Sequence, residues 1–313
     1  MSQHSGKVLI AAPVHSVLTD GLRAAGYECI MMEHIMQAIA YLHISDCVGV
    51  VTSTRLQLDK ALIDVAPDLR WIGRMGSGME VIDIAYATER GIRCFSSPEG
   101  NRNAVAEHAL GMLLSLTKHI GSSNQEVKQG KWLRDENRGT ELEGKTIGII
   151  GFGNTGSAFA QKLAGFEMKI LAYDKYAPQN IPSHIVNCKN LTPIFEEADI
   201  VSFHVPIQDD TKNYLNDIFI TNMCKGFIAI NTSRGIVADT KALWKGLQSG
   251  KIRGACLDVW EQEPIDRMSK DSLDIFNKMV ALPNVIITPH IAGYSHEALY
   301  KMSSILLYKI INA

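Results

Sequence analysis

Short runs of apolar, often β-branched residues alternate with segments of helical periodicity along almost the whole sequence. In such a pattern each strand is followed by a crossover helix, so neighbouring strands must run parallel. The later strand-like runs are almost continuously apolar, as expected for strands that are covered by helices on both faces. Strands are predicted at residues 7–12, 28–32, 48–52, 69–74 and 92–96, and in a second series at 146–150, 169–174, 200–204, 227–232, 254–259 and 285–288.

The length of 313 residues fits two domains of ordinary size. We interpret Pro98–Gly100 and Pro289–Gly293 as two crossings between them, because a last predicted helix, at about residues 295–311, follows the second strand series. The sequence therefore predicts an α/β protein with two Rossmann-like or flavodoxin-like domains built on parallel sheets. The first domain is discontinuous, with residues 1–98 plus 290–313, and the second comprises residues 99–289.

One long helix is predicted between the two strand series, over residues 102–129. Leu110, Leu113, Leu114 and Thr117 recur at helical spacing and give it an apolar stripe. A polar, glycine-punctuated stretch follows before the second series begins.

Charge and composition exclude several classes of function. Lysine and arginine number 31 against 33 aspartates and glutamates, so the net charge of −2 argues against a nucleic-acid partner. No two of the six cysteines form a CxxC pair, so we expect no metal site and a reducing, cytoplasmic compartment. The longest apolar helical stretch, residues 104–116, is interrupted by Glu107 and His108, so we expect no membrane partner.

The two ends of the sequence add two expectations. The N-terminus lacks a basic region and a cleavage site, so no signal peptide is expected. Since the sequence ends after the last predicted helix, we expect no C-terminal regulatory extension.

A glycine-rich loop stands between a predicted strand and a predicted helix, in the order Gly151-Phe152-Gly153-Asn154-Thr155-Gly156. In this position the first glycine permits a tight turn, the second lets a pyrophosphate approach the backbone, and the third lets helix and strand pack closely. The N-terminus of the following helix offers free N–H groups to an anion. The loop therefore predicts a dinucleotide site.

Asp174 ends the next predicted strand, where a carboxylate can accept hydrogen bonds from the two ribose hydroxyls. The same charge repels a 2′-phosphate, which favours NAD over NADP, although Lys175 beside it weakens this discrimination. FAD or S-adenosylmethionine would use similar parts.

Three polar side chains follow other strands of the second series: Arg234, Glu263 and His290. Ligands of open α/β sheets bind outside the carboxyl ends of the strands, so all three should lie at the cofactor's edge of the sheet. An arginine suits a substrate carboxylate, a histidine can give a proton to a carbonyl oxygen, and a carboxylate can hold that histidine in place. This set is what oxidoreduction of a hydroxy acid requires.

The sequence resembles the D-isomer-specific 2-hydroxyacid dehydrogenases over essentially its whole length. The phosphoglycerate dehydrogenase and hydroxypyruvate (glycerate) reductase branch is the most similar. The resemblance is carried by GRMGSGMEVID (73–83), NAVAEHALGMLL (103–114), GKTIGIIGFGNTG (144–156), ADIVSFHVP (198–206), NTSRG (231–235), GACLDVWEQEP (254–264) and TPHIAG (288–293).

The resemblance implies a role for each matching residue. Arg234 would bind the substrate carboxylate and carbonyl, His290 would be the acid and base, and Glu263 would be its partner. The first domain would be the substrate domain and the second the NAD-binding domain. Further cofactor contacts would come from Val205, Pro206, Thr232, Ser233, Asp258, His290 and Gly293, beside Gly151, Gly153, Asn154, Thr155, Gly156 and Asp174.

Further substrate contacts are expected from four other residues. The backbone N–H groups of Ser77 and Gly78 would bind the substrate carboxylate, and Arg74 and Arg134 match positions suited to a substrate phosphate. The helix beginning near Asn103 and the arm through Trp132 would form the interface of a homodimer.

The expected activity is NAD-dependent interconversion of a D-2-hydroxy acid and its 2-oxo acid, with phosphoglycerate dehydrogenase activity favoured. Glycerate, hydroxypyruvate or glyoxylate reduction is the alternative within the family. An NAD-responsive corepressor that binds other proteins is the alternative of another class. Formate oxidation fits less well, because that branch uses glutamine where this sequence has Glu263.

Overall fold

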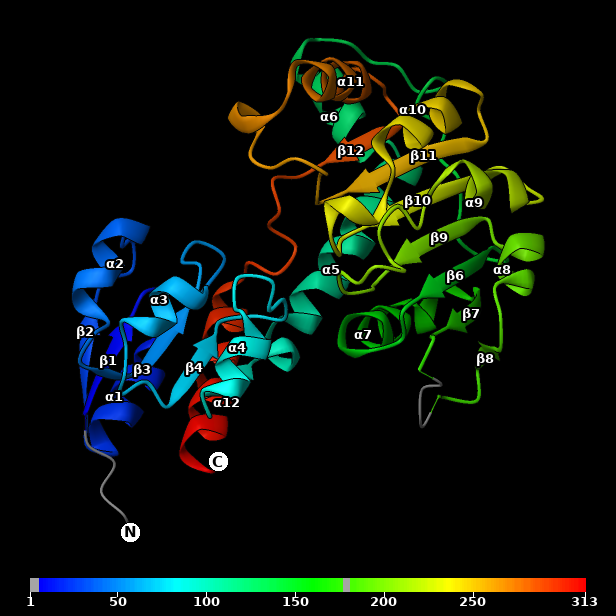
Figure 1. Ribbon diagram of the computed structural model, residues 1–313. Coiled ribbons are helices and arrows are strands. Elements are labelled where there is room, and N and C mark those ends of the chain that lie inside the picture. Colours follow the sequence, from blue (N-terminus) through cyan, green and yellow to red (C-terminus); the bar gives the residue numbers. More distant parts are fainter. Residues whose placement is uncertain (1–5, 177–180) are drawn as a thin grey trace. The chain divides into compact units, whose positions relative to one another are not determined.

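The computed structural model describes residues 6–176 and 181–313, which divide into two compact units (Figure 1). Unit 1 comprises Met1–Arg102 and Tyr294–Ala313, and unit 2 comprises Asn103–Gly293. The divisions fall after residues 102 and 293, whereas the sequence placed them after residues 98 and 289, four residues earlier in each case.

Unit 1 contains a five-stranded parallel sheet in the order β2-β1-β3-β4-β5. Its strands are β1 (Gly6–Ile10), β2 (Tyr27–Met31), β3 (Cys47–Thr52), β4 (Trp71–Arg74) and β5 (Arg93–Ser96). Its helices are α1 (Ser16–Ala24), α2 (Gln37–His43), α3 (Lys60–Asp64), α4 (Ile84–Glu89) and α12 (His296–Ile311). This strand order is that of flavodoxin-like folds.

Unit 2 contains a seven-stranded parallel sheet in the order β12-β11-β10-β9-β6-β7-β8. Its strands are β6 (Thr146–Ile150), β7 (Lys169–Tyr173), β8 (Ile185–Cys188), β9 (Ile200–Phe203), β10 (Phe227–Asn231), β11 (Ile252–Leu257) and β12 (Val285–Ile287). The strand order reverses between β6 and β9, so the sheet has a topological switch point, where α/β proteins bind ligands.

The helices that accompany this sheet differ widely in length. They are α5 (Pro98–Thr117, whose first residues belong to unit 1), α6 (Ile120–Lys128), α7 (Asn154–Leu163), α8 (Thr192–Glu197), α9 (Asp217–Asn222), α10 (Thr240–Gln248) and α11 (Lys270–Val280). Short 3₁₀ turns lie at Ala164–Phe166, Gly235–Val237 and Ile265–Arg267.

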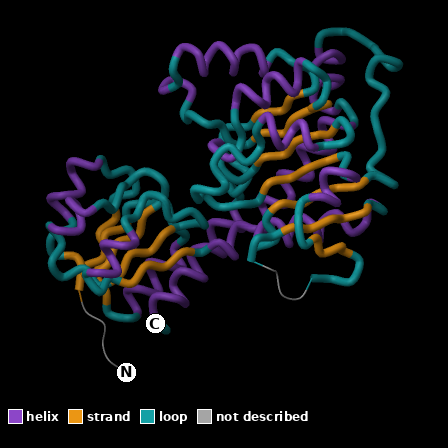
Figure 2. Tube along the Cα trace, turned by 45° about the vertical axis from the view of Figure 1, so that its right-hand side comes forward, coloured by secondary structure: helices purple, strands orange, loops and turns teal. Residues whose placement is uncertain are grey.

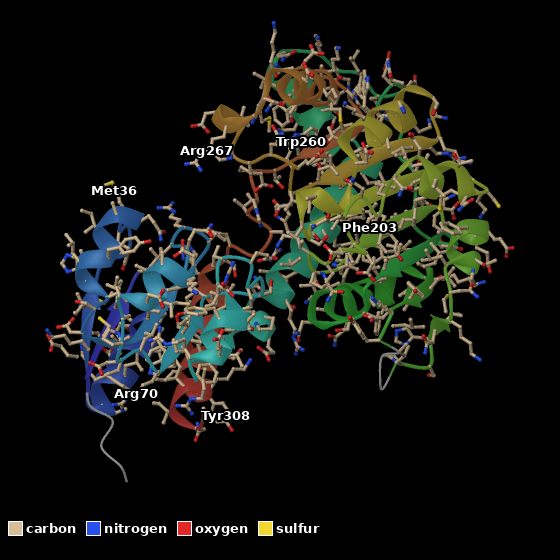
Figure 3. All side chains as sticks on the ribbon, in the orientation of Figure 1. Met36, Arg70, Phe203, Trp260, Arg267 and Tyr308 are labelled. Atoms are coloured by element: carbon tan, nitrogen blue, oxygen red, sulfur yellow. The ribbon has the colours of Figure 1, made fainter. Side chains whose placement is uncertain are left out.

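Each face of the sheet in unit 2 has its own apolar core, and Figure 2 shows helices on both sides of the strands. Phe203 of β9 is fully buried in one core, among residues of α8, α9, α10 and α11 (Figure 3). Ile149 of β6 lies in the other core, which includes Leu113 of α5 and Phe159 of α7. Burial on both faces explains the continuously apolar strands, and the predicted fold class is confirmed.

The structure corrects the predicted helix at residues 102–129 at its start and in its interior. Pro98–Gly100, interpreted as a crossing, forms the first turn of α5, where proline's missing N–H group has no helical partner to lose. The helical run then breaks at His119, which has φ 54° in the left-handed region, and α6 begins at Ile120. Strand β8 was not predicted. Within the described residues, no helix has the length and apolarity to cross a membrane.

Gly148 in β6 packs directly against Ile194 of α8, and we predict that Gly148→Ala destabilises unit 2. A Cβ there would lie 2.6 Å from Cγ2 of Ile194, whose side chain is fully buried and cannot move aside. The overlap should lower the free energy of unfolding by about 1–3 kcal/mol in urea denaturation. Gly165→Ala is the matched control: a Cβ at Gly165 meets no atom within 4 Å, so its effect should stay within about 0.5 kcal/mol. Equal effects of the two variants would contradict this packing argument.

Candidate active site

The glycine loop after β6 has the backbone geometry that a dinucleotide phosphate requires. Gly151 has φ 89°, and a Cβ there would lie 2.4 Å from the carbonyl oxygen of His204. A Cβ on Gly156 would lie 2.0 Å from the carbonyl oxygen of Gly151. At Gly153, by contrast, a Cβ would meet no described atom within 4 Å, so the backbone is open to a ligand there. The three glycines therefore provide a tight turn, an open stretch of backbone and a close contact between loop and helix.

Helix α7 begins directly behind this loop, at Asn154, and its N-cap residue Gly153 provides no side-chain hydrogen bond. The N–H groups of Asn154, Thr155 and Gly156 belong to the first turn, where no helical carbonyl is available to accept them. The helix dipole adds a partial positive charge at the same end. This N-terminus can therefore receive a phosphate group, which is the fit expected for a dinucleotide.

Asp174 follows β7 and is tied to the glycine loop. Its Oδ2 accepts a hydrogen bond from the backbone N–H of Phe152 at 2.7 Å, and its Oδ1 accepts one from Tyr176 at 2.8 Å. Each carboxylate oxygen can accept a second hydrogen bond, so the group can still receive ribose hydroxyls. Lys175, which was expected to weaken the preference for NAD over NADP, forms an ion pair with Asp210.

The end of β9 lies against the glycine loop on its other side. Val205 Cγ1 would be 3.0 Å from a Cβ on Gly151, and the carbonyl of Pro206 accepts a hydrogen bond from Thr211 Oγ1 at 2.6 Å. His204 was not singled out by the sequence. Burial lowers the pKa of His204 to about 4, so this histidine is neutral near pH 7 and adds no charge to the site.

The loop after β10 is shaped by Asn231, a residue that the sequence analysis did not assign to the site. Its Oδ1 accepts hydrogen bonds from the N–H and the hydroxyl of Ser233 at 3.1 and 2.8 Å. Its Nδ2 donates to the carbonyl of Arg234 at 2.9 Å. An asparagine two residues before a serine is an Asx-turn signal, so this role could have been inferred. Thr232, also predicted here, is buried.

Arg234 is positioned by its neighbours on both sides. Its Nη1 donates to the carbonyl of Ser233 at 2.7 Å. The next residue, Gly235, packs directly on the loop after β11, since a Cβ there would lie 1.8 Å from the carbonyl oxygen of Trp260. Trp260, which is labelled in Figure 3, in turn packs edge-on against Phe276 of α11, with ring centroids 5.1 Å apart. The loops after β10 and β11 therefore form one packed body.

Glu263 and His290 form the pair expected from the sequence. His290 Nδ1 lies 2.8 Å from Glu263 Oε2, and Glu263 Oε1 accepts a hydrogen bond from the N–H of Trp260 at 2.6 Å. Partial burial raises the pKa of the Glu263 carboxyl. The hydrogen bonds from His290 and Trp260, with the charges of His290 and Arg234, outweigh this effect, so the net pKa is below its ordinary value. Glu263 is therefore an ionised partner for His290 near neutral pH.

Asp258 anchors the turn that carries His290. It is 1% exposed, and its carboxylate accepts hydrogen bonds from the backbone N–H groups of Ile291 at 2.9 Å and Ala292 at 2.8 Å. Its carbonyl accepts the N–H of His290 at 2.8 Å. The predicted site residue Gly293 ends this turn and is the last residue of unit 2.

The predicted substrate contacts of unit 1 lie at the end of β4, which is Arg74, and in the loop after it. Gly78 is buried and Ser77 is exposed. Arg74 is 8% exposed, and its Nη1 donates to the carbonyl of Met75, so its guanidinium lies against its own loop. Arg134 belongs to unit 2, in the exposed stretch between α6 and β6. Unit 2 thus brings together Glu263, His290 and Asp258, while Ser77, Gly78 and Arg74 belong to the other unit.

Comparison with known proteins defines the class to which this site belongs. Residues 110–292 match the family model described as the NAD binding domain of D-isomer specific 2-hydroxyacid dehydrogenases. The chain is 37% identical over 266 residues to a hydroxypyruvate reductase of Thermotoga maritima, covering 85% of this chain and 83% of that protein. The chain therefore belongs to the D-isomer-specific 2-hydroxyacid dehydrogenase family, and NAD is confirmed as the predicted cofactor.

Two further relatives show how far the likeness extends. The chain is 33% identical over 307 residues to a D-3-phosphoglycerate dehydrogenase of Archaeoglobus fulgidus, covering 98% of this chain but only 57% of that protein. The chain thus spans little more than half the length of this relative. The crystal structure of D-lactate dehydrogenase from Aquifex aeolicus, complexed with NAD and lactic acid, matches with a TM-score of 0.83 at 27% identity, covering 98% and 94% of the two chains.

The lowered pKa of Glu263 predicts how its contribution to stability depends on pH. Because the folded pKa lies below the unfolded value, the stabilisation is present above the unfolded pKa and is lost as pH falls through the folded pKa. Wild type and Glu263→Gln should therefore differ in free energy of unfolding at about pH 7, and the difference should shrink as pH falls from about 4.3, the unfolded value, through the lower folded pKa. Glutamine is the matched replacement because it can still accept the N–H of Trp260. A difference that stays constant over this range would contradict an ionised Glu263.

Proposed function

We propose that this chain is an NAD-dependent oxidoreductase that interconverts a D-2-hydroxy acid and its 2-oxo acid. The observation that carries the proposal is the 2.8 Å contact between His290 Nδ1 and Glu263 Oε2, in the same unit as Arg234 and the dinucleotide loop. An acid–base group with an ionised partner, a guanidinium and a phosphate cradle are together what this reaction requires. The bound cofactor supplies the hydride in one direction and accepts it in the other.

His290 acts as the proton donor and acceptor in this proposal. Its Nδ1 faces Glu263, so Nε2 is the nitrogen left to face the oxygen on C2 of the substrate. In reduction Nε2 gives its proton to that oxygen, and in oxidation it accepts the proton from the hydroxyl. The negative charge of Glu263 fixes the orientation of the ring and stabilises the imidazolium that oxidation produces.

Arg234 binds the substrate in this proposal. Its planar guanidinium suits a carboxylate, which it can hold through two parallel hydrogen bonds. The backbone N–H groups of Ser77 and Gly78, at the carboxyl end of β4 in unit 1, are proposed to bind the same carboxylate. Asp174 binds the ribose and, because it repels a 2′-phosphate, favours NAD over NADP.

We propose a phosphorylated three-carbon substrate as the first candidate, because a D-3-phosphoglycerate dehydrogenase matches over 98% of this chain. Hydroxypyruvate is the second, because a hydroxypyruvate reductase matches at higher identity and along most of its length. The two candidates differ in whether a cation must bind a phosphate. Arg134 is exposed and Arg74 is engaged with its own loop, so Arg134 is the sharper test of this choice.

A homodimer is proposed from the helical segment that begins near Asn103, which includes α6, and from the arm through Trp132. Trp132 is 77% exposed, and a soluble surface rarely leaves so large an apolar side chain uncovered beside others. Other exposed apolar side chains of α6 and this arm are Ile120, Val127 and Leu133. We also propose a reducing, cytoplasmic compartment, which agrees with the six free cysteines.

His290→Ala tests the central assignment. Losing the acid–base group should lower kcat with a 2-oxo acid and NADH by about 10²- to 10⁴-fold. NADH binding, measured by fluorescence titration, should persist because the glycine loop is unchanged. His184→Ala, at an exposed histidine of the same unit, is the control and should keep full activity. Near-normal kcat in His290→Ala would contradict the assignment of His290 as the acid–base group.

A panel of 2-oxo acids with and without a 3-phosphate tests the substrate class, with NADH oxidation as the measurement. If a phosphate is recognised, Arg134→Ala should raise KM for the phosphorylated acid by about tenfold or more and leave KM for hydroxypyruvate unchanged. Arg138→Ala removes a neighbouring arginine whose side chain is 81% exposed and should change neither value. Equal wild-type rates on both groups of acids would favour hydroxypyruvate or glyoxylate reduction instead.

A further inference from the structure

Three polar side chains from three different elements form a hydrogen-bonded chain behind the His290 turn. His108 lies on α5, Thr288 directly follows β12, and Asp258 directly follows β11. His108 Nε2 lies 3.0 Å from Thr288 Oγ1, and Thr288 Oγ1 lies 2.6 Å from Asp258 Oδ1. Asp258 Oδ1 is also 3.6 Å from His108 Nε2. These hydrogen bonds therefore connect α5 to the Asp258 carboxylate, which anchors the turn that carries His290.

The direction of these hydrogen bonds follows from the single proton of the Thr288 hydroxyl. Its acceptors are Asp258 Oδ1 at 2.6 Å and the much weaker Met112 Sδ at 3.9 Å, so the proton points to Asp258. The oxygen of Thr288 must then accept from His108, which requires a proton on Nε2 of His108. His108 is thus a donor that orients the hydroxyl of Thr288 toward Asp258.

The turn beyond Asp258 has a backbone conformation that needs such support. His290 has φ 56°, in the left-handed region that residues with a side chain seldom adopt. A conformation of this kind persists when the surrounding structure fixes it on several sides. Here Asp258 fixes it through its carbonyl, which accepts the N–H of His290, and through its two carboxylate oxygens, which accept Ile291 and Ala292.

We propose that His108 is a positioning residue for His290. It holds the Thr288 hydroxyl as a donor to Asp258, and Asp258 then holds the turn in which His290 meets Glu263. The proposal rests on the proposed acid–base role of His290. Helix α5 thereby contributes to the reaction through Thr288 and Asp258, although His108 contacts neither Glu263 nor His290.

His108→Leu and His108→Gln separate this role from simple packing. Leucine cannot donate, so kcat should fall by roughly ten- to a hundredfold, the scale expected when a reacting group is misplaced by about 1 Å. Glutamine can donate through its amide and should recover most of the lost kcat. The dissociation constant for NADH should change less than kcat in both, because α7 and its loop, which are proposed to hold the phosphates, are unchanged. Glu107→Gln is the control: this neighbour on α5 contacts Asn103 and Lys162 and should keep full activity.

Thr288→Val and Thr288→Ser test the same chain without altering α5. Valine should cost as much kcat as His108→Leu, and serine, which keeps the hydroxyl, should cost little. The double variant His108→Leu/Thr288→Val should be no slower than either single variant, because both break one chain. If the fold losses in kcat of the two single variants multiplied in the double variant, the two residues would act independently and the proposal would be overturned. A His108→Leu protein with a lower Tm but unchanged kcat would also overturn it.

Amide hydrogen exchange provides a measurement that does not depend on turnover. In His108→Leu the N–H groups of Ile291 and Ala292, which Asp258 accepts, should exchange about tenfold faster or more, while those of β6 stay protected. Unchanged exchange would overturn the proposal even if activity fell. If wild type reduced no 2-oxo acid, the proposed function would fail, and the exchange experiment would still decide whether His108 holds the turn.

Discussion

The parallel pairing of β6, β9, β10, β11 and β12 is the constraint on which the site in unit 2 depends. Parallel strands bring their carboxyl ends to one edge, so side chains that are far apart in the sequence meet there. Thus the glycine loop follows β6, Arg234 follows β10 and His290 follows β12. A sheet with any one of these strands reversed would move its residue to the opposite edge.

Backbone geometry shapes the site at this edge of the sheet as much as side-chain chemistry does. Gly151 must be a glycine because the carbonyl of His204 occupies the space of a Cβ, and Gly235 must be one because Trp260 does the same. His290 has a similar backbone requirement but must keep its imidazole, so the turn is held in place by Asp258 instead. The site therefore has two positions, Gly151 and Gly235, at which no side chain fits. At a third position, His290, the side chain is kept and Asp258 stabilises the backbone conformation.

The sequence predicted the parts of the fold and site that depend on local pattern. Continuous apolar runs predicted ten of the strands in place together with β11, whose start shifted to Ile252. The GxGxxG spacing predicted the tight turn after β6 and the close packing of α7 on this turn. The pairing of Glu263 with His290 was expected from the resemblance, and the 2.8 Å contact agrees with it. The short edge strand β8 was missed because four residues carry too little periodicity. The break at His119 was missed because neither glycine nor proline stands at that position.

Other features were beyond sequence reasoning because they depend on tertiary contacts. Nothing near His108 in the sequence indicates Thr288 or Asp258, which lie 180 and 150 residues away along the chain and meet it only through the packing of α5 on the sheet. The orientation of Arg74 toward the carbonyl of Met75 likewise follows from burial in unit 1 and not from its place in a motif.

The central claim is that unit 2 directs a hydride between nicotinamide and C2 of a 2-oxo acid, with His290 moving the proton. Deuterium transfer tests this most directly. The protein is incubated with NADH deuterated at C4 and with a 2-oxo acid that it reduces, and the product is analysed by NMR and on a chiral column. The account predicts deuterium on C2 of a D-2-hydroxy acid, with the hydroxyl proton derived from solvent. Product that carries no deuterium at C2 from either C4 position, or that has the L configuration, would contradict it.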